Sequence, residues 1–226
     1  MNFLCHALPY FDAPTKSVCT GVPDWLSVVD RRIRARRKSA QNVLPSDDPT
    51  LDAVARGVLA HLDDDRWFHG SEAFTRLNLQ FAIDLRDRLP NDAGFRPTFV
   101  GHILVEMLLD AAYLQHDRNW VDQYYGLIRG CDAAGIEAAV NLITGKPSDR
   151  IAEVIDRFAN LGFLYDYATD AGLWFRVNQV LQRVRLPEIP LSSVDDWLPT
   201  ARTMIVENHV ALLTPEGGVM THPVLG

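Results

Sequence analysis

One segment of the chain, residues 99–114 with the sequence FVGHILVEMLLDAAYL, is apolar around its whole helical circumference except along one line. A helix of this composition has no face for water, so we expect it at the centre of the folded protein. The three polar side chains that interrupt it follow at intervals of four residues: His102, Glu106 and Asp110. A step of four residues advances about 40° beyond a full turn, so these side chains line one seam of the helix. The sequence therefore predicts ionisable groups inside the protein.

Most other apolar residues also recur at helical spacing, and the alternating Val, Ile and Thr runs typical of strands are nearly absent. This pattern favours an all-α fold, with helices bounded by Pro, Gly, Asn, Asp or Ser. The expected helices cover about residues 23–38, 49–68, 71–89, 97–115, 120–142, 148–160, 171–185 and 199–213. No interdomain linker, internal repeat or low-complexity tract is visible. We therefore expect one domain over residues 1–226, a bundle of about seven or eight helices with a loose tail from about residue 214.

The charge balance and the cysteines restrict the setting of the protein. The 226 residues contain 22 Lys and Arg against 29 Asp and Glu, a net charge of −7, which argues against nucleic acid or an anionic membrane as the main partner. Three cysteines without a CxxC pair favour a reducing compartment. The start MNFLCHALPYF lacks the features of a signal peptide, and no uncharged stretch approaches the ~20 residues of a membrane span. We expect a cytoplasmic protein and leave its oligomeric state open.

A second polar seam occurs in the segment VARGVLAHLDDDRWFHG, where His61, Asp65 and His69 follow at intervals of four. A buried, unpaired carboxylate costs several kcal/mol or becomes protonated, so both seams need cations, either metal ions or arginines. The outer residues of a seam are about 12 Å apart along the axis, and only neighbours can share an ion. This indicates two metals, or one metal with a general acid or base. The alternative is hydrogen-bonded core residues, with the DDD at 63–65 in a solvated turn.

The chemistry of the two seams predicts a class of reaction. Imidazole nitrogens and carboxylate oxygens without thiolates favour Mn, Fe, Mg or Zn. Metals in such sites commonly promote phosphate ester hydrolysis, because they lower the pKa of a water and clamp the phosphoryl oxygens. No GxSxG elbow, GxxxxGK[ST] loop or GxGxxG fingerprint is present in the chain. The sequence therefore gives no support to serine hydrolase, P-loop or dinucleotide-binding readings.

Several motifs resemble those of the acyl carrier protein phosphodiesterase family, which comprises all-helical, metal-dependent hydrolases likened to the HD-domain phosphohydrolases. The start MNFLCH is similar to the family's M-N-F-L-A-H and places His6 on its His. The segment GVPDWL resembles Gly-Asn-x-x-x-Asp-Phe and places Asp24 on the acidic position. Residues 163–184 are similar to a family segment that begins W-L-x-N-Y. The resemblance spans most of the chain and implies an HD-domain-like bundle.

The two polar seams also resemble family motifs. HLDDDRWFH is similar to H-R-x-I-D-x-F-T-D, so that His61 and Asp65 match and His69 stands where Asp is usual. EMLLDA is similar to D-x-x-x-D-H, with Glu106 and Asp110 on the two acids and Ala111 in place of the His. His102 has no counterpart in the family, and we add it from the spacing alone. These departures indicate a rearranged ligand set.

The resemblance implies a phosphodiesterase that releases 4'-phosphopantetheine from holo acyl carrier protein or hydrolyses a related phosphodiester. One or two divalent ions are expected, Mn first and Fe, Mg or Zn as alternatives. His61, Asp65 and Asp110 are the expected catalytic residues. The expected metal ligands are His6, Asp24, His61, Asp65, His69, His102, Glu106 and Asp110. The alternative function is a binding or scaffold protein that kept the fold and partly lost catalysis, which Ala111 favours and His102 opposes.

A basic segment, RRIRARRK at residues 31–38, places six basic side chains in eight positions. If the family activity holds, Arg34 and Arg36 would dock an acidic carrier protein or its phosphate, and Arg96 would face a substrate phosphate. The alternatives are a solvated helix end whose charges complement the helix dipole, and a structural ion pair for Arg96. His116, His209 and His222 are expected in loop, surface-helix and tail positions without a role in the site.

Overall fold

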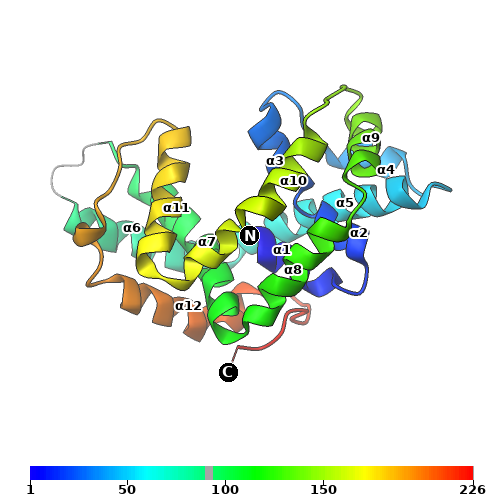
Figure 1. The fold of residues 1–226 in the computed structure, drawn as a ribbon. Coiled ribbons are helices and arrows are strands. Elements are labelled where there is room, and N and C mark those ends of the chain that lie inside the picture. The colour runs from blue at the N-terminus through cyan, green and yellow to red at the C-terminus, as the bar shows by residue number, and fades with distance from the viewer. Residues whose placement is uncertain (90–93, 226) are drawn as a thin grey trace. The chain divides into compact units, whose positions relative to one another are not determined.

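A computed structural model describes residues 1–89 and 94–225 of the chain (Figure 1). Within these ranges the protein has twelve α-helices, three short 3₁₀ segments and no strand, so the all-α prediction is confirmed and the expected number of helices is too low. The helices are α1 (Phe3–Ala7), α2 (Pro14–Cys19), α3 (Val22–Val29), α4 (Arg37–Asn42), α5 (Pro49–Gly70), α6 (Glu72–Arg88), α7 (Pro97–His116), α8 (Arg118–Gly130), α9 (Ala133–Thr144), α10 (Ile151–Leu161), α11 (Asp170–Arg183) and α12 (Leu198–Leu212).

Two of the four extra helices arise because each of two expected ranges contains a break. The helix expected at 23–38 stops at Val29, where Asp30 adopts an extended conformation and accepts hydrogen bonds from the backbone and side chain of Arg32. Residues 30–36 are irregular. The alternative prediction, that the basic segment forms the C-terminal end of a helix, is therefore wrong. The helix expected at 120–142 breaks where the carboxylate of Asp132 accepts a hydrogen bond from the Gly135 N–H and caps α9. Helices α1 and α2 were missed because five or six residues are too few for a periodic pattern.

Contacts along the backbone group the chain into two compact units. The first unit contains Met1, residues 3–66 and residues 119–162, and the second contains Asn2, residues 67–118 and the part after residue 162. Both units are discontinuous in sequence, because the chain leaves the first unit within α5 and returns to it at α8. The expectation of a single domain over the whole chain stays a prediction.

The core of the first unit holds an aromatic cluster and a close helix contact. Phe3 meets Phe158 at a centroid distance of 4.7 Å, and Phe158 meets Trp25 at 5.6 Å, so that α1, α3 and α10 share one apolar centre. Helix α5 approaches α2 where Gly57 has no side chain: a Cβ there would lie 2.7 Å from the Cβ of Cys19. The absence of a side chain at residue 57 therefore sets the position of α5 beside α2.

The core of the second unit is built around α7, which packs mainly against α6 and also against α12. A Cβ at Gly101 would lie 2.8 Å from the backbone oxygen of Asn78, so this glycine lets α6 and α7 approach closely. Helix α7 is long and apolar enough to cross a membrane by length and composition, but 72% of its most apolar window is buried inside the protein. Its burial is that of a core helix, as the continuous apolar pattern of residues 99–114 predicted.

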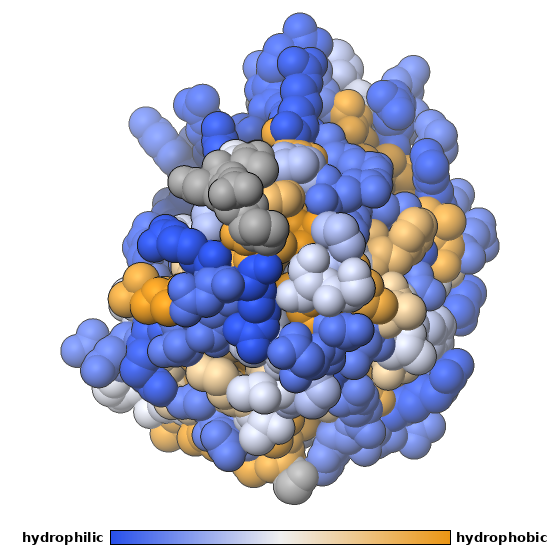
Figure 2. Space-filling model, turned by 90° about the vertical axis from the view of Figure 1, so that its left-hand side faces the viewer, coloured by the Kyte–Doolittle hydropathy of each residue, from blue (hydrophilic) through white to orange (hydrophobic). Residues whose placement is uncertain are grey.

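The expected loose tail is attached to the second unit at several points. The Tyr113 hydroxyl donates a hydrogen bond to the Pro223 carbonyl at 2.8 Å, and the Leu225 N–H donates one to His209 Nε2 at 3.1 Å. His209 is 6% exposed, so its predicted surface position is wrong. His222 lies in the tail as expected, but it is also only 6% exposed. Figure 2 shows one face of the molecule, on which hydrophilic side chains predominate and hydrophobic ones form small separate patches.

Candidate metal sites

Two groups of imidazole and carboxylate side chains are arranged so that each could hold a metal ion. The first cluster consists of His6, His61 and Asp65 in the first unit, and the second cluster consists of His69, His102 and Glu106 in the second unit. In each cluster, one ligand atom from every residue lies within 4.8 Å of the other two. The described structure therefore brings six of the eight predicted ligands into two sets of two histidines and one carboxylate.

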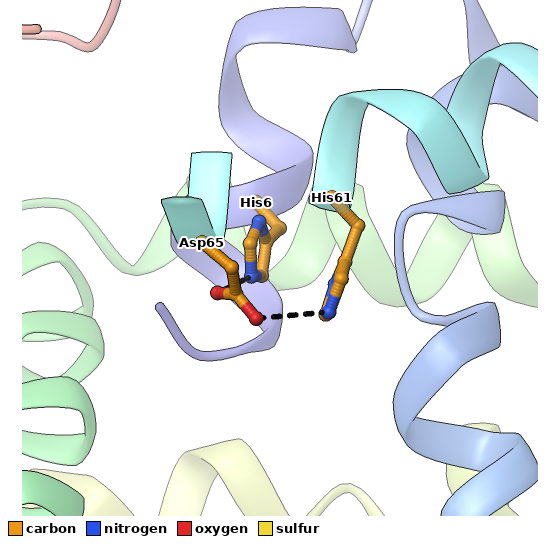
Figure 3. Close-up of side chains that lie close together, drawn as sticks. All are labelled: His6, His61 and Asp65. Carbon is orange, nitrogen blue, oxygen red and sulfur yellow. Dashed lines mark ion pairs between the residues drawn. The ribbon is translucent and has the colours of Figure 1, made fainter. Parts of the chain in front are cut away.

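The first cluster joins α1 to α5 (Figure 3). His61 and Asp65 are one turn apart on α5, and the His61 Nε2 atom lies 3.2 Å from Asp65 Oδ2. His6 comes from α1, with its Nε2 atom 3.2 Å from Asp65 Oδ1. The cluster thus has one carboxylate between two imidazoles, with one imidazole facing each carboxylate oxygen.

The ring nitrogens of His6 and His61 have the environment of metal ligands. His6 is 1% exposed, and its Nδ1 lies 3.3 Å from Asp64 Oδ2 in a hydrogen bond that turns Nε2 towards Asp65. In the described part of the chain, His6 Nε2 and His61 Nδ1 are buried without a hydrogen-bond partner, because the 3.2 Å contact between His6 and Asp65 lacks hydrogen-bond geometry. Buried polar atoms are seldom unsatisfied. A divalent ion fits this donor set, since it would satisfy His6 Nε2.

Positive charge around Asp65 holds it ionised. Burial alone would raise its pKa, but the imidazoles of His6 and His61 beside its two oxygens and the Met1 ammonium group, 2.8 Å from Oδ1, lower the pKa far below its usual range. For His6, burial and the ammonium group favour the neutral ring, whereas the hydrogen bond to Asp64 and the adjacent negative charge of Asp65 prevail and raise the pKa. The carboxylate of Asp65 is therefore ionised and can act as a ligand.

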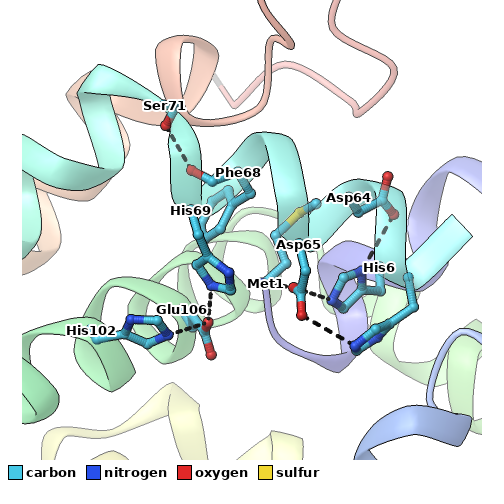
Figure 4. A network of polar contacts seen from close by, with 10 residues as sticks. Met1, His6, Asp64, Asp65, Phe68, His69, Ser71, His102 and Glu106 are labelled. Atoms are coloured by element: carbon cyan, nitrogen blue, oxygen red, sulfur yellow. Dashed lines mark hydrogen bonds and ion pairs between the residues drawn. The ribbon is translucent and has the colours of Figure 1, made fainter. Parts of the chain in front are cut away.

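The second cluster joins the end of α5 to α7 (Figure 4). His69 Nε2 lies 2.8 Å and His102 Nε2 lies 3.1 Å from the same oxygen of Glu106, Oε1. The centroid of the Phe74 ring lies 4.9 Å from the centroid of each imidazole ring, so Phe74 forms an apolar wall beside them. At the end of α5, the Ser71 hydroxyl donates a hydrogen bond to the Phe68 carbonyl at 2.8 Å and fixes the turn that follows His69.

The charge and exposure of the second cluster suit a reactive site. Burial would raise the pKa of Glu106, but neighbouring positive charge and the hydrogen bonds from His102 and His69 lower it well below its usual value. The side chains of His69, His102 and Glu106 are 30%, 35% and 15% exposed. Two imidazole nitrogens and an ionised carboxylate oxygen thus converge at a place that a solute can reach.

The structure groups the predicted ligands across helices, although the two seams run along single helices. Asp110 continues the seam of His102 and Glu106 on α7, but it is 1% exposed in the core and belongs to neither cluster. Asp24 is half-buried on α3 and also lies outside both clusters. The roles assigned to these two carboxylates stay predictions.

One functional candidate was missed in the sequence. The DDD at 63–65 lies within α5 and not in a solvated turn, and Asp64 is only 9% exposed where it contacts His6. A ligating His usually gives its second nitrogen to a carboxylate, so an acidic neighbour of Asp65 on the same helix was the available signal. Arg34, Arg36 and Arg96 are all exposed, the last with a left-handed backbone (φ 51°) directly before α7.

The fold and the two clusters together define an all-α protein with two candidate His₂-carboxylate metal sites. Three protein ligands leave coordination positions open, as in catalytic metal sites, whereas structural zinc sites are closed by four. The sequence matches no family model, and no curated protein or solved structure matches the chain. The resemblance to the acyl carrier protein phosphodiesterases therefore stays a prediction, as does the HD-domain-like arrangement of the helices.

Proposed function

We propose that this protein is a metal-dependent phosphodiester hydrolase in which each cluster holds one divalent ion. The observation that carries the proposal is the convergence of two imidazole nitrogens and one ionised carboxylate in each of two places. Two histidines with one carboxylate bind ions such as Fe²⁺ and Zn²⁺ and leave positions open for water and substrate. Mn²⁺ is our first choice for this nitrogen and oxygen donor set, with Fe²⁺, Zn²⁺ and Mg²⁺ as alternatives.

When bound, a divalent ion supplies Lewis acidity towards phosphoryl oxygens and makes a water more acidic. The chain supplies the arrangement of the ligands. Asp64 fixes the ring of His6, and the helical spacing fixes His61 relative to Asp65. In the second cluster, the low pKa of Glu106 keeps its carboxylate ionised and available as a ligand. The protein thus presents ligands that need no deprotonation of a carboxyl group before a metal binds.

Two features support a phosphodiester as the substrate. The motifs around His6, His61 and Asp65 resemble those of a phosphodiesterase family that releases 4'-phosphopantetheine from holo acyl carrier protein. The second cluster is about one-third exposed at His69 and His102, so a phosphodiester attached to a large carrier has access to it. We therefore propose holo acyl carrier protein, or another molecule with a similar phosphodiester, as the substrate.

A second candidate function is a helical binding or scaffold protein of the same fold. It is favoured by Ala111, which stands where the related family has a His and is fully buried on α7 without a ligating group. Under this alternative, the clusters contribute hydrogen bonds to the fold and bind no metal.

Metal analysis together with matched variants distinguishes the two functions. The wild-type protein should bind up to two equivalents of Mn²⁺, unfold at a higher temperature in its presence and hydrolyse bis(p-nitrophenyl) phosphate. His61→Ala and His102→Ala should each lose one equivalent, whereas His116→Ala, which changes an exposed histidine outside both clusters, should lose none. If the wild-type protein binds no Mn²⁺ and gains neither stability nor activity from it, the hydrolase proposal is wrong and the scaffold function stands.

A further inference from the structure

Besides the first cluster, the first unit has a surface depression of about 390 Å³ that is surrounded by four arginines. Its lining residues are Arg34, Ala35, Arg36, Arg37, Leu62 and Arg66. Three of the arginines come from the irregular segment before α4 and from its first residue, and the fourth comes from α5. We call this feature the arginine pocket. Its volume lies within the range of small-molecule sites.

The positive charge of the arginine pocket is largely uncompensated. Asp63 contacts Arg37 at 2.6 Å, and Arg34 donates a hydrogen bond to the backbone oxygen of Ile33 at 3.3 Å. Within residues 1–89 and 94–225, no carboxylate is in ion-pair contact with Arg36 or Arg66, and both are exposed. Four positive charges against one negative charge leave +3 here, in a chain whose net charge is −7. Like charges held around one depression repel each other unless an anion lies between them.

We propose that the arginine pocket binds an organic phosphate. Guanidinium groups present paired N–H donors that match phosphate oxygens in a bidentate way. Ala35, which is 7% exposed, and the half-buried Leu62 add apolar surface between the charged groups, and this surface suits the carbon portion of the ligand. The four guanidinium groups lie around one depression of about 390 Å³, a size that suits a compact anion.

The arginine pocket is separate from the first cluster. Leu62 and Arg66 follow His61 and Asp65 by one residue each along α5, and one residue turns a helix by about 100°. The pocket and the ligands of the first cluster therefore lie on different sides of α5. Binding of phosphate here needs no metal, and the inference does not rest on the proposed hydrolase activity.

The experiment is an NMR titration of metal-free protein, stripped with EDTA and dialysed into buffer of low ionic strength. The probes are phenyl phosphate, inorganic phosphate and a hexaglutamate peptide. The test variant is Arg36→Gln with Arg66→Gln, and the control is Arg150→Gln with Arg157→Gln, which removes the same charge from exposed positions of α10 and its N-cap in the same unit. Circular dichroism checks that each variant is folded.

We expect saturable binding of phenyl phosphate that shifts the amide signals of Ala35 and Leu62 and is tighter than binding of inorganic phosphate. In the test variant the affinity should fall at least tenfold, and in the control it should stay within a factor of two. Equal affinity in both variants, or no saturable binding, would overturn the proposal. Binding of hexaglutamate in place of phenyl phosphate would also overturn it and would indicate an acidic polypeptide as the partner. If the test variant does not fold, the wild-type shifts decide, because shifts confined to other residues exclude the pocket.

Discussion

The imidazole rings of His6 and His61 are stacked, with their centroids 4.2 Å apart and their planes inclined by 26°. The two rings belong to α1 and α5, and the carboxylate of Asp65 faces both of them. The carboxylate of Asp64 contacts the other ring nitrogen of His6, Nδ1. The first cluster therefore depends on two adjacent acidic residues with different tasks, one as a ligand and one as an orienting group.

Replacing Asp64 by Asn should weaken metal binding at the first cluster by about 10–100-fold, because the ring of His6 loses its charged hydrogen-bond partner. The measurement is Mn²⁺ titration calorimetry in a His102→Ala background, which removes the second cluster. Asp63→Asn is the matched control, since Asp63 is exposed and contacts Arg37. Equal Mn²⁺ affinities in the two variants would show that Asp64 has no orienting role.

Gly101→Ala should lower the free energy of unfolding by about 1–3 kcal/mol, because the new methyl group meets the backbone of Asn78 and forces α6 away from α7. Gly126→Ala is the control: Gly126 lies in α8 with no atom within 4 Å of the added Cβ, so it should gain up to about 1 kcal/mol from helix propensity. Urea unfolding measures both changes. A stabilised Gly101→Ala protein would contradict the close approach of the two helices.

The thiol of Cys131 should react slowly with iodoacetamide. Burial, together with the negative charges of Asp156 and Asp132, disfavours the thiolate and raises the pKa of this thiol to about 11. At pH 8.5 the alkylation rate should therefore be about two orders of magnitude below that of a peptide thiol, and it should rise until the pH reaches about 11. Mass spectrometry after timed labelling gives the rate, and urea-unfolded protein provides the reference. A midpoint near pH 8.5 in the folded protein would contradict the described environment.

His209→Ala should loosen the end of the chain. The Leu225 N–H loses its acceptor, His209 Nε2, and an unsatisfied buried donor costs about 1–3 kcal/mol. Hydrogen exchange at residues 222, 224 and 225 should become faster, whereas the His116→Ala change, at an exposed position of α7, should leave exchange at these residues nearly unchanged. Unchanged exchange in His209→Ala would show that the hydrogen bond does not hold the tail.

Much of the helical fold could be predicted because long amphipathic or apolar segments repeat their pattern over several turns. Helices α5, α6, α7, α10, α11 and α12 lie close to their expected ranges for this reason. The end of α3 could not be predicted, because the segment after Asp30 is rich in Arg, which has good helix propensity, and the turn at Asp30 depends on its contacts with Arg32. The break between α8 and α9 at Asp132 could not be predicted either, because the helical pattern runs through the Asp132 N-cap without interruption.

The candidate sites were predictable only to the extent that they are local. The spacing of four residues predicted that His61 would lie beside Asp65 and that His102 would lie beside Glu106. The third ligand of each cluster comes from another helix, and tertiary packing decides that His6 joins the first cluster and His69 the second. His6 was found through the resemblance alone, because α1 is too short to show a seam.

The polar residues of α7 have a consequence during synthesis of the protein. By length and composition alone, this helix is long and apolar enough to cross a bilayer. A carboxylate at the centre of such a segment opposes its transfer by about 2.5–3.5 kcal/mol on insertion scales measured for Asp. Glu106 stands at the middle of α7 and Asp110 one turn later, so the carboxylates placed there for the interior also discourage the nascent chain from entering lipid. A variant with apolar residues at both positions would lose this barrier.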